Sequence, residues 1–298
     1  MNSKTAFVTI VGRANAGKSS LLNAIIGEKI AMVSDKPQTT RTKITGVLTQ
    51  NEVQYVFMDT PGVHKAKTKL GVHMLQTVKD SVSEIDIVLM VIDTSKKIGE
   101  NEANLIETFK ASHTPVILIL NKIDLIEKEK LVSIIAECSQ MYDFEAIIPI
   151  SVLNNDGIDI VFSEVTKHAV DGPHYFPDDT LTDQPEKVLA AEIIREKLLQ
   201  LLNEEVPHGI AVTIEEMKER EDKDILDISA NIFCERDSHK GIVIGKNGAM
   251  LKKVGSLARE ELESFFQIKV NLQCWVKVKQ DWRNKEGMIK NFGLDSRK

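Results

Sequence analysis

The fold is decided by the stretch Gly12-Arg13-Ala14-Asn15-Ala16-Gly17-Lys18-Ser19, which fits the pattern GxxxxGK[ST] of a phosphate-binding loop. It follows a β-branched apolar run at 6–11 and opens a helix-like segment at 18–26, the strand-to-helix context that the pattern requires. Its glycines let backbone N–H groups face a phosphate, and the helix N-terminus adds a favourable dipole. The residues expected to bind the nucleotide phosphates here are Gly12, Asn15, Ala16, Gly17, Lys18, Ser19 and Ser20.

A second motif, Asp59-Thr60-Pro61-Gly62, follows the strand-like run 53–58. A carboxylate at a strand end can hold Mg²⁺, and the Gly62 N–H can contact a γ-phosphate. Between the two motifs lies the Thr-rich segment 37–42, which is typical of a loop that closes over γ-phosphate and metal, although a solvated loop is the alternative. We expect Mg²⁺ ligands at Ser19, Asp59 and Thr40, with Thr39 as the rival of Thr40. The predicted catalytic residues are Lys18, Thr40 and Gly62.

The base of the nucleotide is predicted from Asn121-Lys122-Ile123-Asp124, which follows the buried apolar run 116–120. Asp124 can accept hydrogen bonds from both N1–H and the exocyclic amine of guanine, whereas a buried carboxylate facing adenine would stay unpaired. Asn121 is expected to tie this loop to the P-loop, and the stem of Lys122 to lie along the base. A backbone N–H of Ser151 or Val152, after the run 147–150, would meet guanine O6. The expected ligands are therefore GTP or GDP with Mg²⁺.

The order of predicted elements divides the chain. Strands and helices alternate over 1–172, which predicts an α/β domain with a mostly parallel sheet. A Pro- and Gly-bearing acidic stretch at 173–185 is predicted to be a linker. Residues 186–298 follow the order α-β-β-α-α-β, which matches an α+β domain of the type II KH arrangement.

Charge and a short loop indicate RNA as the partner of that second domain. The net charge is −6, yet 239–298 holds 13 Lys and Arg against 6 Asp and Glu, and the rest of the chain carries −13. Gly245-Lys246-Asn247-Gly248 lies between helix-like pieces at 240–244 and 249–265, the setting in which KH domains clamp a nucleic-acid backbone. Trp275 and Trp282 are open between packing and base stacking, and Val243 and Ile232 between core and base groove. The predicted RNA-binding residues are Ile242, Ile244, Gly245, Lys246, Asn247, Gly248, Lys252 and Lys253.

Other classes are disfavoured by composition. No stretch approaches the about 20 uninterrupted apolar residues of a membrane-spanning helix, and the N-terminus lacks the apolar core of a signal peptide. Three widely spaced cysteines fit neither a disulfide framework nor a zinc site, so we expect reduced thiols in a cytoplasmic protein. A monomer is expected, because no obvious dimer helix is present.

With these motifs assembled, the chain resembles the Era-like family of translation-factor-related bacterial GTPases over nearly its whole length. The resemblance includes the P-loop, 37–41, 59–62, 121–124, the stretch Tyr175-Phe176-Pro177-Asp178-Asp179 and the GxxG loop. It implies slow GTP hydrolysis, binding of small-subunit ribosomal RNA near its 3′ end through the KH domain, and assistance in assembling the 30S-type subunit. It also implies peripheral association with the inner face of the cell membrane. Ala14, Ala16 and Val152 stand where the family usually has Pro, Val and Ala.

Hydrolysis itself is open in two respects. Val63 occupies the position at which Ras-type enzymes carry a water-orienting Gln, and its side chain cannot form hydrogen bonds. Related GTPases use an Asn at the position of Asn15 to bind K⁺, so K⁺ is a hypothesis here, with a loop-stabilising side chain as the alternative. His64 is close in sequence to the water site, although a solvated loop residue is the alternative. Two further functional readings are kept: an RNA chaperone with GTP as a structural ligand, and a membrane-associated growth regulator.

Overall fold

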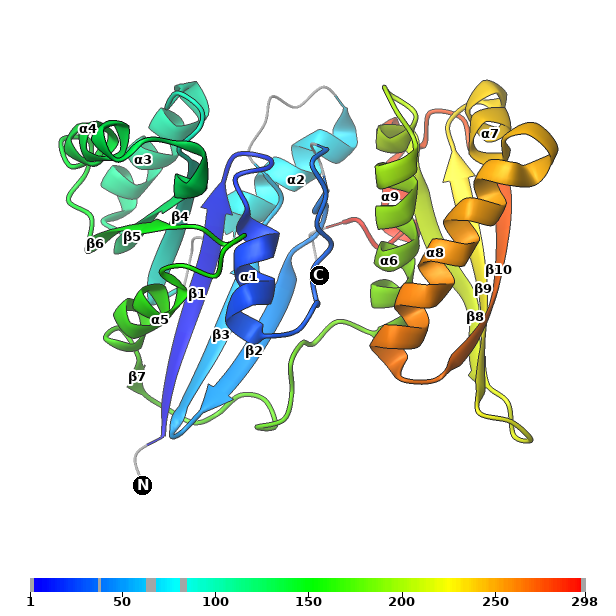
Figure 1. Cartoon of the computed structure of the whole chain (residues 1–298), viewed down its shortest axis with the longest axis horizontal. Coiled ribbons are helices and arrows are strands. Elements are labelled where there is room, and N and C mark those ends of the chain that lie inside the picture. Colours follow the sequence, from blue (N-terminus) through cyan, green and yellow to red (C-terminus); the bar gives the residue numbers. More distant parts are fainter. Residues whose placement is uncertain (1–2, 37–38, 63–67, 81–84, 296–298) are drawn as a thin grey trace. The chain divides into compact units, whose positions relative to one another are not determined.

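The structure is a computed structural model that describes residues 3–36, 39–62, 68–80 and 85–295. The chain forms two compact units, the first made of 1–66 and 71–183, the second of 67–70 and 184–298 (Figure 1). The change from one unit to the other near residue 183 falls inside the stretch 173–185. Each unit has a hydrophobic core of its own.

Within the described part of the first unit, seven strands form one sheet in the order β2-β3-β1-β4-β5-β6, with β7 on β1. The neighbours from β3 to β6 are parallel, whereas β2 is antiparallel to β3 and β7 to β1. The predicted mostly parallel sheet is therefore confirmed. The bounds are β1 Lys4–Gly12, β2 Ile44–Gln50, β3 Val53–Asp59, β4 Ile87–Asp93, β5 Val116–Asn121, β6 Ala146–Ile150 and β7 Val170–Asp171.

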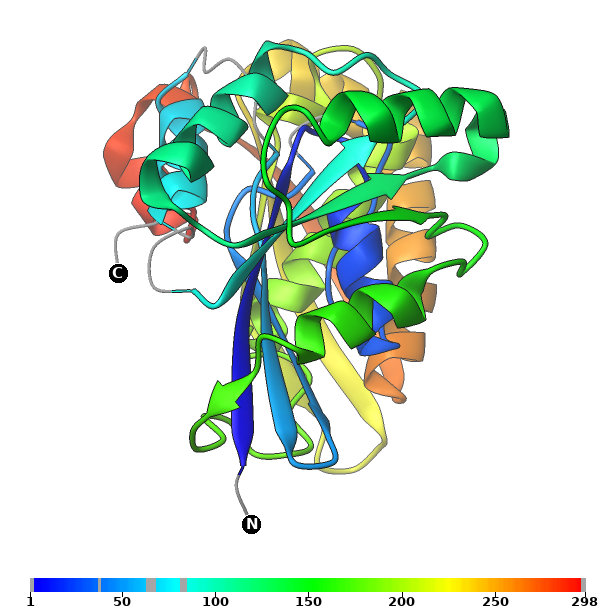
Figure 2. The same cartoon turned by 90° about the vertical axis from the view of Figure 1, so that its left-hand side faces the viewer.

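Helices cover both faces of this sheet (Figure 2), which explains the continuous apolar runs of its central strands. In β4 the alternate residues Ile87, Leu89 and Val91 join the core under α1 and α5. Val88 and Met90 join the core under α3 and α4 instead. The bounds are α1 Lys18–Ile26, α2 Lys69–Asp80, α3 Glu100–Ser112, α4 Lys128–Cys138 and α5 Ile158–Thr166, with a 3₁₀ turn η1 at Ile123–Leu125.

The carboxyl ends of four parallel strands meet at one edge of the sheet. Strand β1 ends at Gly12, β3 at Asp59, β4 at Asp93 and β5 at Asn121. The register places Asp93 beside Asn121. Loops that follow parallel strands converge at this edge in α/β proteins, so the predicted motifs are brought together by topology alone.

The stretch after β7 is bound along the other strands of the first unit. The Gln54 side chain donates to Phe176 O (2.8 Å) and accepts from Tyr175 N (2.7 Å). Further on, Val47 N donates to Leu181 O (2.8 Å) and Thr182 Oγ1 to Thr45 O (2.6 Å). Residues 173–182 thus form a strap over β2 and β3, and this name is kept below.

The second unit has the predicted order α-β-β-α-α-β, which confirms the KH-like arrangement. Its three strands lie in the order β10-β9-β8, with β10 parallel and β8 antiparallel to β9. Helices α6, α7 and α8 contribute to one core with this sheet. The elements are α6 Glu186–Leu201, η2 Pro207–Gly209, β8 Ala211–Glu219, β9 Ile225–Cys234, α7 Asp237–Ile244, η3 Lys246–Gly248, α8 Ala249–Phe266, β10 Lys269–Val278, η4 Trp282–Asn284 and α9 Glu286–Asn291.

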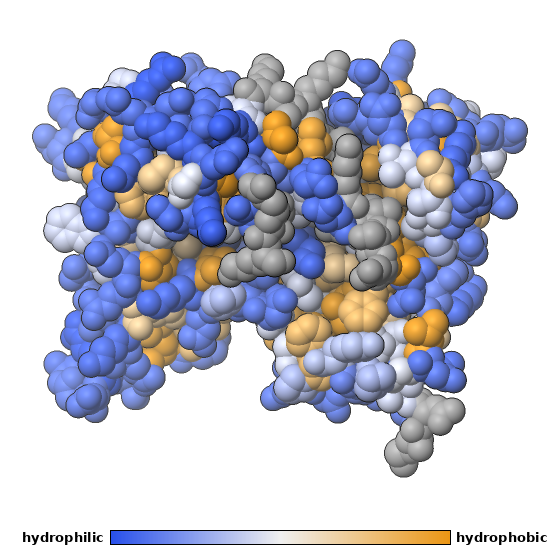
Figure 3. Space-filling view, turned by 180° about the vertical axis from the view of Figure 1, so that it is seen from behind, coloured by the Kyte–Doolittle hydropathy of each residue, from blue (hydrophilic) through white to orange (hydrophobic). Residues whose placement is uncertain are grey.

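On the face drawn in Figure 3, hydrophilic residues cover most of the visible surface and hydrophobic ones form small patches. Among the described residues, no helix is both long and apolar enough to span a bilayer.

Candidate functional site

The P-loop backbone admits only glycine at two positions. At Gly12, with φ +149°, an added Cβ would lie 2.3 Å from Val91 O. At Gly17, with φ +100°, it would lie 2.1 Å from Asn121 Nδ2. Both the left-handed backbone and the lack of space exclude a side chain, so the two glycines are fixed by packing as well as by any ligand.

Lys18 is held at the base of the site. It is 6% exposed, and its ammonium group donates to Arg13 O at 3.0 Å. Burial lowers the pKa of Lys18, and the nearby Asp59 carboxylate opposes that shift in part. An ammonium group has three donors, so one bond to the Arg13 carbonyl, the partner seen among the described residues, leaves donors for phosphate oxygens.

Three oxygen-bearing side chains converge from three segments. Ser19 Oγ lies 2.6 Å from Asp59 Oδ2 and 2.9 Å from Thr40 Oγ1, and Thr40 Oγ1 lies 3.4 Å from Asp59 Oδ2. Asp59 is fully buried, and its Oδ1 has no hydrogen-bond partner in the described parts of the chain. Burial raises the pKa of Asp59 against the opposing effects of Lys18 and of its hydrogen bonds. An orphaned carboxylate oxygen beside two hydroxyls is a donor set that fits Mg²⁺.

The rival threonine points elsewhere, because Thr39 Oγ1 donates to Lys36 O at 2.5 Å. The geometry therefore favours Thr40 over Thr39 as the third metal ligand. Around these groups is a hollow of about 430 Å³, and Gly62 lies at its wall. Its lining residues are Ala14, Asn15, Gly17, Lys18, Ser19, Ser20, Met32, Val33, Ser34, Asp35, Thr39, Thr40, Gly62, Asp93, Ser95, Lys96 and Lys122.

The loop 121–124, which the sequence predicts to contact the base, is tied to the P-loop as expected. Asn121 Nδ2 donates to Ala16 O at 2.9 Å, and Asn121 Oδ1 accepts from the N–H of Lys122 at 2.8 Å. Ser151 Oγ donates to Asp124 Oδ1 at 2.5 Å and so orients that carboxylate. Asp124 itself is exposed in the middle of the 3₁₀ turn η1. The discrimination argued from the sequence therefore requires that the base itself cover this carboxylate when it binds.

The two amides predicted to meet guanine O6 both have partners. Ser151 N donates to Asp156 O at 3.1 Å, and Val152 N donates to Asn121 Oδ1 at 3.2 Å. The geometry does not distinguish between them as contacts for O6, and both stay predictions.

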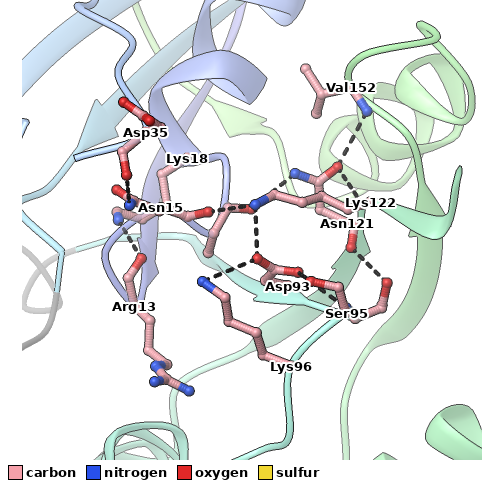
Figure 4. Close-up of polar contacts among 12 residues, drawn as sticks. Arg13, Asn15, Lys18, Asp35, Asp93, Ser95, Lys96, Asn121, Lys122 and Val152 are labelled. Atoms are coloured by element: carbon pink, nitrogen blue, oxygen red, sulfur yellow. Dashed lines mark hydrogen bonds and ion pairs between the residues drawn. The ribbon is translucent and has the colours of Figure 1, made fainter. Parts of the chain in front are cut away.

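Asp93, at the end of β4, is a site residue that the sequence reasoning missed (Figure 4). Its Oδ2 accepts from Lys122 Nζ at 2.7 Å and pairs with Lys96 at 3.6 Å, and its Oδ1 accepts from Ser95 Oγ at 2.5 Å. Partial burial alone would raise the pKa of Asp93, but the hydrogen bonds from Lys122 and Ser95 outweigh it and lower the pKa. The available signal was a carboxylate ending a buried strand at the edge of the other motifs.

Asn15 has a left-handed backbone, with φ +65°, and its side-chain amide donates to Asp35 O. The backbone carbonyl of Asn15 accepts a hydrogen bond from Lys122 Nζ at 2.8 Å. The side chain thus bridges the P-loop to the loop ahead of Thr40 (Figure 4). Residues 37–38, Val63 and His64 lie outside the described residues.

The GxxG loop in the second unit has the backbone of a clamp. Gly245 has φ +72°, and a Cβ there would meet the Met250 Cβ at 2.7 Å. Gly248 has φ +79° with open space in the direction of a Cβ, so a ligand can approach closely. Among the predicted RNA residues, Ile242 is 48% exposed. Ile244 and Gly248 are partly exposed, and the side chains exposed around the loop are Lys246, Asn247, Lys252 and Lys253.

For four residues the sequence leaves open whether they pack in the core or contact RNA bases, and their burial distinguishes these roles. Val243 and Ile232 are fully buried, so both belong to the core and neither forms a base groove. Trp282 is also fully buried and donates to Gly209 O at 2.8 Å, whereas Trp275 is 57% exposed.

Comparison with known proteins agrees with the division of the chain into two domains. The family described as 50S ribosome-binding GTPase matches residues 7–122, and the KH domain family matches residues 205–283. GTPase Era of Ruminiclostridium cellulolyticum is 51% identical over 298 residues, covering all of both chains. The chain belongs to the Era family of GTPases. GTPase Era of Clostridioides difficile is also 51% identical, over 99% of both chains.

Solved Era structures share the whole fold. One is Era in complex with MgGDPNP and nucleotides 1506–1542 of 16S ribosomal RNA, and another is an Aquifex aeolicus Era variant bound to GDP·AlF₄⁻. Each has a TM-score of 0.94 and 38% identity, and covers 98% of this chain and 99% of its own. As an Era GTPase, the chain has a GTPase domain with a mostly parallel sheet followed by a KH domain.

Proposed function

We propose that this chain binds and hydrolyses GTP as a switch, and that its KH domain binds small-subunit ribosomal RNA near the 3′ end during assembly of that subunit. The observation that carries the GTPase part is the convergence of Ser19, Thr40 and the orphaned Asp59 oxygen beside the buried Lys18. The 16S RNA and MgGDPNP in the related Era complex support the rest.

The chain's own groups divide the work. P-loop amides and the Lys18 ammonium group bind the β- and γ-phosphates and stabilise charge that develops on them. Mg²⁺, held by Ser19, Thr40 and Asp59, would neutralise phosphate charge. Gly62 would offer its N–H to the γ-phosphate. Because Thr40 lies in the loop after residue 36, loss of that phosphate releases the loop, which is the basis of a switch.

Asp124, which Ser151 orients, selects guanine. Hydrogen bonds from Asn121 and Lys122 to P-loop carbonyls fix the position of the loop 121–124 relative to the P-loop. A base without the N1–H and amine donors leaves the carboxylate desolvated and unpaired. Discrimination of about 10⁴-fold or more is typical of such a site.

RNA is expected at the GxxG loop, with Gly245, Lys246, Asn247 and Gly248 against the backbone. Ile242, Ile244, Lys252 and Lys253 flank the loop. Two paired variants test both halves in the full chain. Asp124→Ala is expected to abolish the preference for GTP over ATP while RNA capture persists. Gly248→Asp is expected to abolish RNA capture while GTP binding persists. Equal binding of GTP and ATP by the unmodified protein would refute the GTPase site.

The two alternative readings make different predictions. If GTP serves only as a structural ligand of an RNA chaperone, turnover is the same with and without RNA, whereas a switch is stimulated by RNA. If the protein acts at the inner face of the membrane, it should sediment with anionic vesicles, and added salt should weaken this binding. The reason is that the Lys-rich C-terminal part would contact the anionic lipids. We expect the protein to be located in the cytoplasm and to be a monomer.

A K⁺ ion beside Asn15 is part of the proposal. The Asn15 side chain lies in the P-loop at the hollow. K⁺ bound there would add positive charge beside the phosphates, in a site where Val63 has no hydrogen-bonding group to orient the water. Hydrolysis is expected to be faster in KCl than in NaCl, and Asn15→Ala to remove the difference. Equal rates in both salts would refute the K⁺ site and leave the GTPase assignment intact.

A further inference from the structure

Trp275 is exposed in an unusual place. It lies in the middle of β10, an edge strand of the KH sheet, with 57% of its surface in solvent. The other tryptophan, Trp282, is fully buried. The exposed indole offers a flat apolar face together with an N–H donor, the combination that suits a planar polar ligand.

The alternation of β10 places Trp275 on the face of the sheet away from the helices. Leu272, Cys274 and Val276 pack into the core that α6, α7 and α8 share with the sheet. The residues between them therefore project to the opposite face. Lys279 N donates to Cys234 O at 2.8 Å, so the strand pairing continues beyond the end of β10. The outward row is Gln273, Trp275, Lys277 and Lys279, all exposed.

Charge changes along this outer face. At the β8–β9 turn lies a hollow of about 570 Å³ in which carboxylates outnumber cations: its charged lining residues are Glu216, Glu219, Glu221, Asp222 and Asp227 against Lys218 and Arg220. At the opposite end of β10 stand Lys277 and Lys279, and the Glu215 carboxylate lies 3.9 Å from the Lys277 amine. The register partners of Gln273 and Trp275 on β9 are uncharged. An anionic ligand is therefore favoured from Trp275 towards Lys279 and disfavoured towards the turn.

We propose that Trp275, Lys277 and Lys279 form a second RNA-binding strip, on which a base stacks against the indole while the adjoining phosphates bind the two lysines. The proposal rests on the RNA-binding function proposed above and extends it beyond the GxxG loop. A KH loop clamps only about four nucleotides, so a longer strand must continue over another surface. A planar ring next to cations fits single-stranded RNA better than an acidic peptide, because only the nucleic acid uses the ring and the charges together.

Binding to two RNA lengths tests the strip. One single-stranded RNA fills only the GxxG groove, and the other is extended by about ten nucleotides at each end, well beyond the about four that the loop clamps. Trp275→Leu is expected to leave the dissociation constant of the short RNA unchanged. It should weaken binding of the long RNA by about 5- to 150-fold, the effect of losing one stacked base. Trp275→Phe, which keeps a ring, should restore most of the affinity.

Two further readouts separate stacking from charge. Only the long RNA should quench the emission of the exposed Trp275, since Trp282 is buried and shielded. The double variant Lys277→Ala/Lys279→Ala should reduce the slope of log K against log salt by about 1.4 for the long RNA, or about 0.7 per phosphate. Lys269→Ala is the matched control on the same strand, because Lys269 is exposed at the acidic end and pairs with Glu263 at 3.3 Å.

An unchanged affinity of Trp275→Leu for the long RNA would overturn the strip. So would an equal loss on both RNAs, since Trp275 would then serve the GxxG groove. If Gly248→Asp leaves binding of the short RNA intact, the proposed function of the GxxG loop fails. The strip still stands if the long RNA depends on Trp275.

Discussion

The ammonium group of Lys122 lies 2.7 Å from Asp93 Oδ2 and 2.8 Å from Asn15 O. This one side chain thus joins the loop 121–124 to the end of β4 and to the P-loop. An ion pair with a carboxylate that is 7% exposed is screened less than a surface pair, so it holds the loop in place before nucleotide arrives.

Asp93→Asn is expected to weaken binding of GTP and GDP equally, by about 5- to 30-fold, the effect of about 1–2 kcal/mol from a lost charge-assisted hydrogen bond. The turnover number at saturating GTP should stay unchanged, because Asp93 positions Lys122 and does not contact the transferred phosphate. Titration calorimetry and steady-state kinetics measure the two effects. Lys96→Met, which removes the more exposed partner of the same carboxylate, is the control. A fall in turnover with unchanged affinity would contradict this role.

Ser151→Ala should act on base selection alone. The hydroxyl donates to Asp124 Oδ1 at 2.5 Å, and without it the exposed carboxylate can rotate away from the base. We expect GTP affinity to fall by about fivefold, because one hydrogen bond contributes about 1 kcal/mol, and this effect should be smaller than that of Asp124→Ala. Competition of GTP with ITP, which lacks the exocyclic amine, measures it. If Ser151→Ala affects GTP and ITP equally, the hydroxyl does not orient the carboxylate.

Gly17→Ala should break the tie between the two nucleotide loops. The new methyl group would lie 2.1 Å from Asn121 Nδ2 on a backbone with φ +100°, so Asn121 must leave the Ala16 carbonyl. Nucleotide binding is expected to fall by more than about 100-fold, since the site loses both its shape and a buried hydrogen bond. Gly27→Ala, with φ +81° and nothing within 4 Å, is the matched control, and it should retain nucleotide binding with a stability loss of about 1 kcal/mol. Equal binding by both variants would refute the argument.

Contiguous motifs made most of the nucleotide site predictable from sequence, because each motif carries its own backbone geometry and the topology of a parallel sheet brings the motifs to one edge. Asp93 was missed for the opposite reason. It is a single residue whose partner, Lys122, is 29 positions away, and its role appears only in the register of β4 beside β5.

Composition misleads where three-dimensional pairing decides. The Pro- and Gly-bearing stretch 173–185 has the composition of a linker, yet most of it bonds to β2 and β3 through Gln54 and Thr45. Exposure cannot be read from residue type either. Trp275 stands between the apolar Cys274 and Val276 yet is turned outward by the strand alternation, whereas Trp282 stands between charged residues yet is buried in η4.

The strap over β2 and β3 should loosen as pH rises. His174 Nδ1 lies 2.8 Å from Asp178 Oδ1, and Nε2 lies 3.3 Å from Glu52 O, so both ring nitrogens face acceptors and only the imidazolium can donate to both. The Asp178 hydrogen bond raises the pKa of His174 against an opposing effect of desolvation, and the bond to Glu52 O adds to the rise.

A raised folded-state pKa stabilises the strap below the ordinary histidine value of about 6.5, and the contribution is lost as pH rises through the raised value. Amide hydrogen exchange at Tyr175 and Phe176, corrected for the intrinsic pH effect, should therefore accelerate between about pH 6 and pH 8. His174→Gln should show no such step. An equal step in that variant would assign the pH dependence to another group.

Trp282 should be the main anchor of the C-terminal segment on the KH domain. It is fully buried, its indole N–H donates to Gly209 O at 2.8 Å, and its ring meets Phe292, which also packs against Phe233. Trp282→Ala removes a large buried side chain and leaves a buried carbonyl without its donor, so the KH domain should lose about 3–5 kcal/mol. Amide hydrogen exchange in β9 and α8 under native conditions measures this loss locally, without assuming that the two-domain chain unfolds in one step.

Trp275→Ala, the exposed counterpart, should change the same protection by less than about 0.5 kcal/mol. A comparable loss of protection in both variants would show that Trp275 also packs against the domain. That result would contradict both the role of Trp282 as the main anchor and a Trp275 that is free to contact RNA.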